Sequence, residues 1–315
     1  MAEIQHRTIA VDGINMHIAE AGEGPMVLLL HGFPECWYSW RHQLAALSDA
    51  GYHVVAPDQR GYGLTDAPDA VEDYDIIHLT DDAAGVVKAL GEEKAVIVGH
   101  DWGSGVAWNG ALQHPETFHA VITMSVPYSG RAPSEPVATM RQAFGEDFYI
   151  VRFQTPGVAD AEMGADVRAT MKTTLIGASA QRLPDLETMS GPEAFQRAAE
   201  APLPAWLSEA DLDAFVESFE KSGFTGGINW YRNIDRNWAL TPQLAGASVK
   251  QPTLFFIGRK DLEFLTAGPG IEAMKASVPN LRDVIWLEDC GHWTQQEKAD
   301  DVNAGMITFL NEVCK

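Results

Sequence analysis

A short glycine-flanked turn, residues 99–103 (GHDWG), follows the apolar run 95–98 and precedes a segment that can form a helix. Strand, sharp turn and helix together are typical of a nucleophile elbow, in which small residues must flank the tip. The tip here is Asp101, at the position where an esterase of this pattern carries serine. A carboxylate attacks strained or activated sp³ carbon and forms an alkyl ester. The turn therefore predicts covalent catalysis on an epoxide or an alkyl halide.

Asp101 could also be a simple helix cap, because aspartate is a favoured N-cap residue. The flanking glycines and the preceding apolar run favour the nucleophile.

An ester on Asp101 must then be hydrolysed by an activated water. His292 follows the last predicted strand, in the segment 288–292 (EDCGH). Its neutral imidazole can accept a proton from water near neutral pH, because the ordinary pKa of histidine is about 6.5.

A third residue is expected to orient this imidazole, and it should follow the predicted strand 253–257. Asp261 lies there, and Glu263 could take the same place. The order nucleophile, acid, histidine is that of triads built on this type of turn. Attack of water on the ester produces an oxyanion, for which the backbone N–H groups of Trp102 and Phe33 are the expected donors.

The composition excludes several other functional classes. The chain has 315 residues, 46% of them hydrophobic, which is enough for a sizeable core. Its net charge of −22, spread along the chain, repels nucleic acid and anionic lipid. The chain has no apolar run of about 18 residues, so no membrane-spanning helix is predicted. Residues 1–6 do not resemble a secretory signal. Three distant cysteines indicate reduced thiols, and no Cys/His cluster has zinc spacing. We therefore expect a cytoplasmic protein without a bound metal.

Strands and helices alternate along most of the chain. We expect strands at 7–11, 15–20, 26–30, 52–56, 95–98, 120–124, 253–257 and 283–287, and helices at 40–47, 79–90, after the turn 99–103, around 271–276 and at 302–313. Such alternation predicts an α/β fold with a mostly parallel central sheet flanked by helices on both faces. The continuous apolar run 26–30 is typical of a strand buried on both faces.

The alternation stops between residues 127 and 246, where helix-forming segments such as 209–221 replace the strands. The preceding segment 127–136 is rich in proline and small residues, as expected of a linker. An insertion after a sheet strand would lie over the carboxyl ends of the strands, where open α/β sheets bind ligands. We predict a core of residues 1–128 and 246–315 and a helical lid of residues 129–245. An independent helical domain is the alternative, although predicted strands flank the segment on both sides.

Six motifs occur along the chain in this order: 31–34 (HGFP), 58–63 (DQRGYG), 99–103 (GHDWG), 152–157 (RFQTPG), 229–233 (NWYRN) and 291–294 (GHWT). With them the chain resembles the soluble epoxide hydrolases of the α/β-hydrolase superfamily, in particular the small plant and bacterial forms without an additional N-terminal domain. The motifs span essentially the whole chain. The first is shared by much of the superfamily, whereas the two motifs in the predicted lid make the set specific.

The resemblance implies the α/β-hydrolase fold and the hydrolysis of epoxides to vicinal diols without a cofactor. It selects Asp261 as the acid that orients His292, and it implies a cis peptide bond before Pro34. It also assigns Tyr149 and Tyr231, both in the predicted lid, as donors to the epoxide oxygen. A phenol with a pKa of about 10 stays protonated at neutral pH and can donate. Without the resemblance, each tyrosine would be interpreted as a packing residue.

Two other functions have to be compared with this one. A haloalkane dehalogenase would use the same aspartyl ester, and such enzymes share Asp followed by Trp, but they lack the paired lid tyrosines and commonly carry a polar side chain in place of Phe33. A fluoroacetate-type dehalogenase would have arginine in place of Trp102. A non-enzymatic receptor is a third reading, because fold alone does not determine function. The expected partners are a small epoxide and water, with no nucleic acid or membrane, and the sequence leaves monomer and homodimer open.

Overall fold

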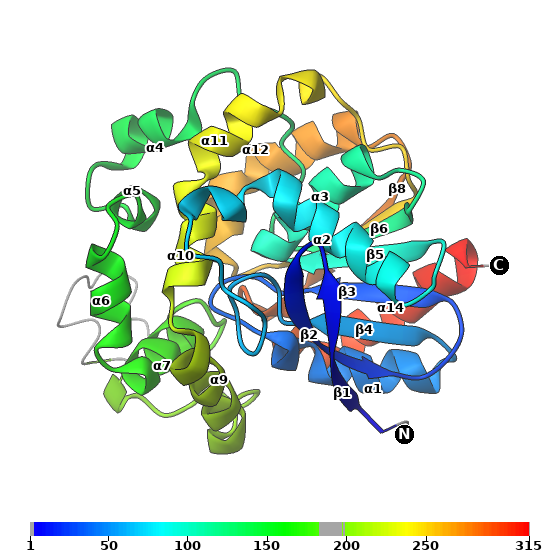
Figure 1. Cartoon of the computed structure of the whole chain (residues 1–315), viewed down its shortest axis with the longest axis horizontal. Helices are drawn as coiled ribbons and strands as arrows, with labels where there is room; N and C mark the ends of the chain where they lie inside the picture. Colours follow the sequence, from blue (N-terminus) through cyan, green and yellow to red (C-terminus); the bar gives the residue numbers. More distant parts are fainter. Residues whose placement is uncertain (1–2, 183–196, 198, 315) are drawn as a thin grey trace.

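The computed structural model describes residues 3–182, 197 and 199–314, and between 262 and 269 it describes the backbone only. Eight strands form one sheet in the order β1-β2-β4-β3-β5-β6-β7-β8 (Figure 1). Their bounds are β1 Gln5–Val11, β2 Ile14–Ala21, β3 Met26–Leu30, β4 His53–Pro57, β5 Ala95–His100, β6 Phe118–Met124, β7 Thr253–Gly258 and β8 Leu281–Leu287. Each lies within about two residues of its predicted range, the usual uncertainty of element boundaries.

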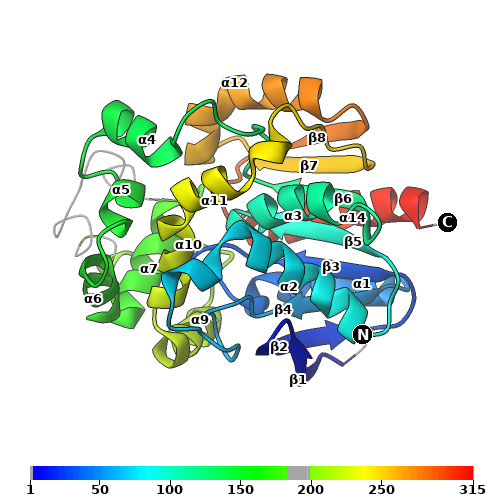
Figure 2. The same ribbon diagram turned by 45° about the horizontal axis from the view of Figure 1, so that its top comes forward.

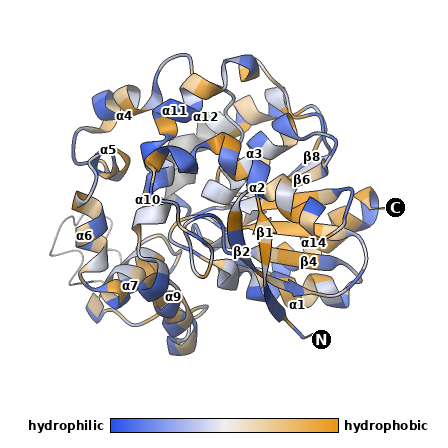
Figure 3. Cartoon of the chain, viewed as in Figure 1, coloured by the Kyte–Doolittle hydropathy of each residue, from blue (hydrophilic) through white to orange (hydrophobic). Residues whose placement is uncertain are grey.

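The sheet is parallel from β4 to β8 and antiparallel at its first edge, where β1 pairs with β2 and β2 with β4. The hairpin of β1 and β2 turns at Asp12 and Gly13, both with positive φ. All residues of β3 and β5 are buried. Figure 3 shows hydrophobic residues concentrated along the strands, while the helices carry both hydrophobic and hydrophilic residues. The predicted mostly parallel sheet is confirmed.

Helices cover both faces of the sheet (Figure 2). One hydrophobic cluster joins α1 (Arg41–Asp49) and α14 (Ala299–Val313) to one face, and the other joins α2 (Ile76–Ala89), α3 (Trp102–Gln113) and α12 (Leu262–Ser277) to the opposite face. The predicted helix at 40–47 is α1, preceded by a short 3₁₀ turn, η1 (Trp37–Trp40). The predicted helix at 271–276 is the last part of α12.

The described residues between β6 and β7 form helices and no strand. These helices are α4 Pro136–Phe144, α5 Tyr149–Phe153, α6 Val158–Gly164, α7 Val167–Gly177, α9 Glu209–Ser222, α10 Thr225–Arg232 and α11 Ile234–Leu240. They lie together beside one end of the sheet (Figures 1 and 2). This end carries the loops that follow β3 and β5, because Phe33 and Trp102 both contact Tyr231 of α10. The division at 128/129 and 245/246 stays a prediction.

Within the described part of the chain, no helix combines the length and apolar character needed to cross a membrane.

Candidate active site

Asp101 occupies the tip of the turn between β5 and α3. Its backbone has φ 51° and ψ −121°, a strained conformation for a residue other than glycine and one that is common at functional turns. A Cβ atom on Gly103 would lie 2.0 Å from the carbonyl oxygen of Leu30, so no larger residue fits there. The Asp101 side chain makes no capping hydrogen bond to α3. The helix-cap interpretation of this aspartate therefore has no support in the structure.

The Asp101 carboxylate is held by the loop that follows β3. The Phe33 N–H donates to Asp101 Oδ1 over 2.8 Å, and a Cβ atom on Gly32 would lie 2.2 Å from the same oxygen. The Phe33–Pro34 peptide is cis, as the resemblance implies. Trp102 is the first residue of α3, and an N–H at this position has no partner within its helix. The oxyanion role of the two backbone groups stays a prediction.

His292 lies between two carboxylates. Its Nδ1 is 3.2 Å from both Oδ1 and Oδ2 of Asp261, and its Nε2 is 3.6 Å from Oδ2 of Asp101. Asp261 follows β7 and is fully buried, while His292 is 7% exposed. An ionised carboxylate only accepts, so His292 Nδ1 carries a proton and donates to Asp261. The structure thus brings together the three predicted triad residues. The side chain of Glu263, the other candidate acid, lies outside the described residues.

The two carboxylates determine the protonation of His292. Burial alone would lower the pKa of this imidazole, but the negative charges of Asp261 and Asp101 and their hydrogen bonds raise it well above its ordinary value of 6.5. The two carboxylates therefore favour the imidazolium form of His292. Loss of the charge on Asp101 would remove one of the two groups that stabilise this proton.

The two predicted lid tyrosines are far apart in the sequence but lie on neighbouring helices. Tyr149 begins α5 and is 42% exposed, and Tyr231 lies on α10 and is 4% exposed. Their ring centres are 5.8 Å apart. The Tyr231 ring packs edge-on against Trp102, with centres 5.0 Å apart. Burial, and then the charge of Asp101, raise the pKa of Tyr231 well above 10, so that its phenol stays protonated.

A single cavity of about 370 Å³ contains all five predicted side chains, namely Asp101, Asp261, His292, Tyr149 and Tyr231. Its size lies in the usual range of small-ligand pockets. Sequence reasoning did not find four residues that complete its wall: Phe153, Met163, Thr174 and Ala178. They come from α5, α6, α7 and the residue after α7, and no local pattern in the sequence distinguishes a pocket-lining lid residue from a packing residue.

A buried pair, His100 and Glu35, joins the loops that carry Phe33, Asp101 and His292, and sequence reasoning did not find Glu35. His100 Nδ1 lies 2.7 Å from Oε2 of Glu35, and His100 Nε2 lies 2.7 Å from the carbonyl oxygen of His292. Both ring nitrogens of His100 thus face oxygen atoms of neighbouring loops. Glu35 also accepts the Gly32 N–H at 3.1 Å. Burial would raise the pKa of Glu35, but His100 and the hydrogen bonds lower it to about 2.

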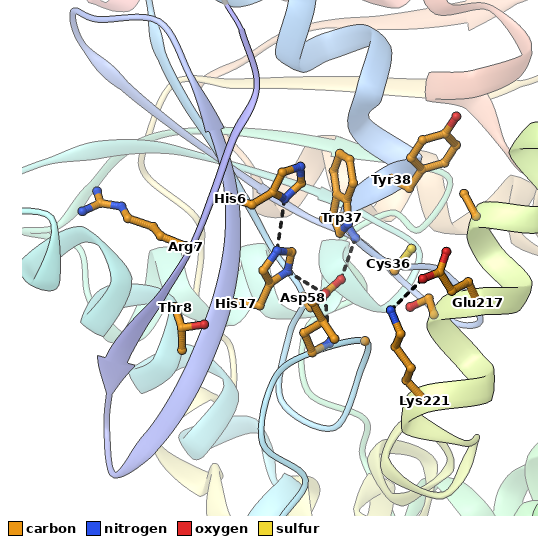
Figure 4. Close-up of a pocket in the computed structure, with 14 residues that line it drawn as sticks. His6, Arg7, Thr8, His17, Cys36, Trp37, Tyr38, Asp58, Glu217 and Lys221 are labelled. Carbon is orange, nitrogen blue, oxygen red and sulfur yellow. Dashed lines mark hydrogen bonds and ion pairs between the residues drawn. The ribbon is translucent and has the colours of Figure 1, made fainter.

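A second polar cluster lies outside the cavity, beside the hairpin of β1 and β2 (Figure 4). Asp58, the first residue of the motif 58–63, accepts from His17 Nδ1 at 2.8 Å and from the backbone N–H groups of Trp37 and Leu64 at 3.0 and 3.1 Å. His6 Nδ1 lies 3.1 Å from His17 Nε2. This motif therefore joins the hairpin, the 3₁₀ turn η1 and its own loop, as expected of a structural turn.

Comparison with known proteins agrees with this geometry. A family model described as the alpha/beta hydrolase fold matches residues 25–299. Epoxide hydrolase A of Mycobacterium tuberculosis is 45% identical, over 96% of this chain and 96% of that protein. Epoxide hydrolase 1 of Siraitia grosvenorii is 42% identical, over 99% of this chain and 100% of that protein. The chain belongs to the epoxide hydrolase group of the α/β-hydrolase family.

Solved structures of this family are similar over nearly the whole chain. An epoxide hydrolase from an endophytic Streptomyces has a TM-score of 0.94 at 42% identity, covering 98% of this chain and 95% of that one. The epoxide hydrolase VrEH1 of Vigna radiata has a TM-score of 0.91 at 42% identity, with 98% of each chain covered. The α/β-hydrolase fold and the family resemblance expected from the six motifs are confirmed for this hydrolase.

Proposed function

We propose that this protein hydrolyses epoxides to vicinal diols, without a cofactor, through an alkyl ester on Asp101. The observation that carries the proposal is the shared cavity, in which a nucleophilic carboxylate, an imidazole–carboxylate pair and two lid phenols face one space of about 370 Å³. A small apolar epoxide fits a cavity of this size and wall chemistry.

In the first step an Asp101 oxygen attacks an epoxide carbon. Because Oδ1 is held by the Phe33 N–H, Oδ2 is the oxygen that bonds to carbon. The ring C–O bond breaks, and its electron pair goes to the epoxide oxygen. That oxygen takes a proton from Tyr231 or Tyr149, which avoids an alkoxide leaving group. The product of this step is a hydroxyalkyl ester, and Asp101 has lost its charge.

In the second step a water molecule attacks the Asp101 carbonyl carbon. Once Asp101 is neutral, the pKa of His292 falls, its proton passes to the tyrosinate, and the neutral imidazole accepts a proton from the water. The oxyanion forms on Oδ1, where the Phe33 N–H already donates and the Trp102 N–H is the second donor. Collapse of this intermediate breaks the bond between the Asp101 carboxyl carbon and Oδ2, which leaves as an oxygen of the diol and takes the proton that His292 holds. The new carboxyl group then gives its remaining proton back to His292, and one water oxygen stays in the Asp101 carboxylate.

Asp261 keeps His292 in the orientation that this step requires. With both carboxylate oxygens 3.2 Å from Nδ1, it holds Nε2 toward Asp101 and stabilises the imidazolium that forms. A haloalkane dehalogenase would share this second step but would need a halide site instead of phenol donors. The two tyrosines and Phe33 at the cavity wall favour the epoxide.

Two measurements test the proposal. Styrene oxide and 1-bromobutane are supplied in parallel, and we expect diol from the first and no halide release from the second. Halide release alone would assign a dehalogenase, and inactivity with both would indicate a receptor. In a single turnover with excess enzyme in ¹⁸O water, the label should appear in Asp101 and not in the diol. Label that enters the diol directly would exclude the ester.

A further inference from the structure

A second cavity, of about 450 Å³, lies between α3 of the core and α4 and α11 of the lid. In Figures 1 and 2, α11 lies between α4 and α3. Most side chains around the cavity are apolar, among them Trp108 and Leu112 of α3, Met140 of α4 and Ile234 of α11. Trp102 forms one wall. None of the five predicted catalytic side chains lines this cavity.

Arg131 is the only charged side chain among the described residues that line the second cavity. It is half-buried in the loop after β6. The structure shows no carboxylate of the described residues within ion-pair distance of it, although the chain has 44 acidic residues and a net charge of −22. Many other arginines do have such a partner: Arg7, Arg41, Arg60, Arg141, Arg152, Arg168, Arg232, Arg236, Arg259 and Arg282.

The position of the Arg131 guanidinium is determined by Trp238. Its Nε and Nη2 atoms donate to the Trp238 carbonyl oxygen over 3.3 and 2.9 Å, and its Cζ lies 4.1 Å from the centre of the Trp238 ring. Trp238 is fixed in turn, because its Nε1 donates to the Ala132 carbonyl over 2.8 Å. An arginine has five N–H donors, so donors remain for a ligand. A guanidinium held in this way binds an anion with little further loss of side-chain freedom.

We propose that this cavity binds an amphipathic carboxylate, whose carboxyl group pairs with Arg131 and whose apolar body lies against Trp108, Leu112 and Met140. A single cation beside an otherwise uncharged, mostly apolar wall matches a ligand with one anionic end. A carboxylate suits the planar guanidinium, which can donate two parallel hydrogen bonds to it. A cavity of about 450 Å³ lies within the range of small-molecule sites.

The site is adjacent to the active site but separate from it. Trp102 lines the second cavity, and its ring packs edge-on against Tyr231, which lines the first. A ligand in the second cavity therefore leaves the space around Asp101 open. The binding proposal does not depend on the reaction at Asp101, and its test needs no turnover.

The test is calorimetric titration of the full-length protein with octanoate and decanoate, with decanol as the neutral analogue and decylammonium as the cationic one. We expect decanoate to bind about tenfold or more tightly than decylammonium, because charge-assisted hydrogen bonds to Arg131 are lost with the cation. Each added methylene should tighten binding about fourfold. Decanoate should not raise the KM for styrene oxide, because the two cavities are distinct.

Three variants locate the site. Arg131→Gln should weaken decanoate at least about fivefold and leave decanol unchanged, whereas Arg131→Lys should retain part of the preference for the anion. Gly105→Leu should abolish binding of decanoate and of decanol, because Gly105 lines the cavity and a leucine side chain there would fill it. The protein should tolerate this change, since a Cβ atom at Gly105 meets only a Trp102 ring carbon, at 3.9 Å. The matched control is Arg141→Gln, which removes an exposed lid cation paired with Glu146 and should bind decanoate as the wild type does.

The melting temperature of each variant is measured alongside, so that loss of folding is separated from loss of the site. The proposal is overturned if folded Arg131→Gln binds decanoate as tightly as the wild type, or if decylammonium binds as well as decanoate. Competition between decanoate and styrene oxide would place the ligand at Asp101 instead. Absence of detectable decanoate binding at 25 °C would also overturn it.

Discussion

The carboxylate of Glu35 and the imidazole of His100 form a fully buried pair, with Oε2 and Nδ1 2.7 Å apart. Glu35 belongs to the loop that carries the Phe33 N–H, and His100 directly precedes Asp101. The other nitrogen of His100 holds the carbonyl oxygen of His292. One buried pair thus joins the loops that carry Asp101, Phe33 and His292.

Glu35→Gln should destabilise the protein by about 3–5 kcal/mol, because it removes one partner of a fully buried, hydrogen-bonded pair. The new amide would also direct N–H donors at the side-chain amides of Gln295 or Gln296, which now donate to Glu35 Oε1. Urea unfolding measures the change. Glu217→Gln, an exposed partner of Lys221, is the control and should stay within about 0.5 kcal/mol of the wild type. A change in unfolding free energy within about 0.5 kcal/mol for Glu35→Gln would show that the Glu35–His100 pair does not stabilise the fold.

The same pair predicts how stability depends on pH. The pKa of Glu35 is about 2 in the folded protein, below its ordinary value of 4.5. A group with a depressed folded pKa stabilises the protein above its unfolded pKa, and this stability is lost as the pH falls through the folded pKa. The unfolding free energy of the wild type should therefore decline between pH 4.5 and pH 2 more steeply than that of Glu35→Gln. Parallel curves would contradict the lowered pKa of Glu35.

His292→Gln should allow alkylation of Asp101 and stop hydrolysis of the ester, because glutamine cannot accept a proton from water. Mass spectrometry of the variant after exposure to styrene oxide should show an adduct equal to the mass of the epoxide, on the peptide that contains Asp101. The double variant Asp101→Ala/His292→Gln is the control and should show none. An unmodified His292→Gln protein would count against the two-step scheme.

Replacement of Tyr149 and Tyr231 together by phenylalanine should slow ring opening by about 10²–10⁴-fold, the usual contribution of a general acid. Tyr231→Phe alone should have the larger effect of the two single changes, because Tyr231 is buried against Trp102 whereas Tyr149 is 42% exposed. Tyr128→Phe, whose hydroxyl donates to the Ala247 carbonyl outside the catalytic cavity, should retain normal turnover. Near-normal ring opening in the double variant would make the two residues packing residues.

The pKa of His292 should differ between the free enzyme and the ester. In the free enzyme the charges of Asp261 and Asp101 raise it well above 6.5, and alkylation removes the charge of Asp101. The rate of ester hydrolysis requires neutral His292, so it should rise with pH through an apparent pKa lower than that of the free enzyme. NMR titration of His292 gives the first value, and single-turnover hydrolysis gives the second. Equal values would show that Asp101 does not contribute to the raised pKa.

Much of the fold could be predicted from local patterns. The apolar run of β3, the turn after β5 and the helical segment at α9 are recognisable because hydrophobic periodicity and turn chemistry depend on neighbouring residues. The order of Asp101, Asp261 and His292 along the chain also pointed to a triad. The roles of these residues and of the two tyrosines remain proposals, although the structure places all five in one cavity.

The sequence by itself determined which segments are strands and helices and which side chains could react. Other features depended on the tertiary structure alone. Only the packing of distant segments decided that Glu35 meets His100, that Met163 and Thr174 line the cavity, and that Arg131 faces an apolar wall without a described carboxylate near it. Such contacts join residues far apart in the chain, and they result from many weak interactions that leave no periodic signal in the sequence.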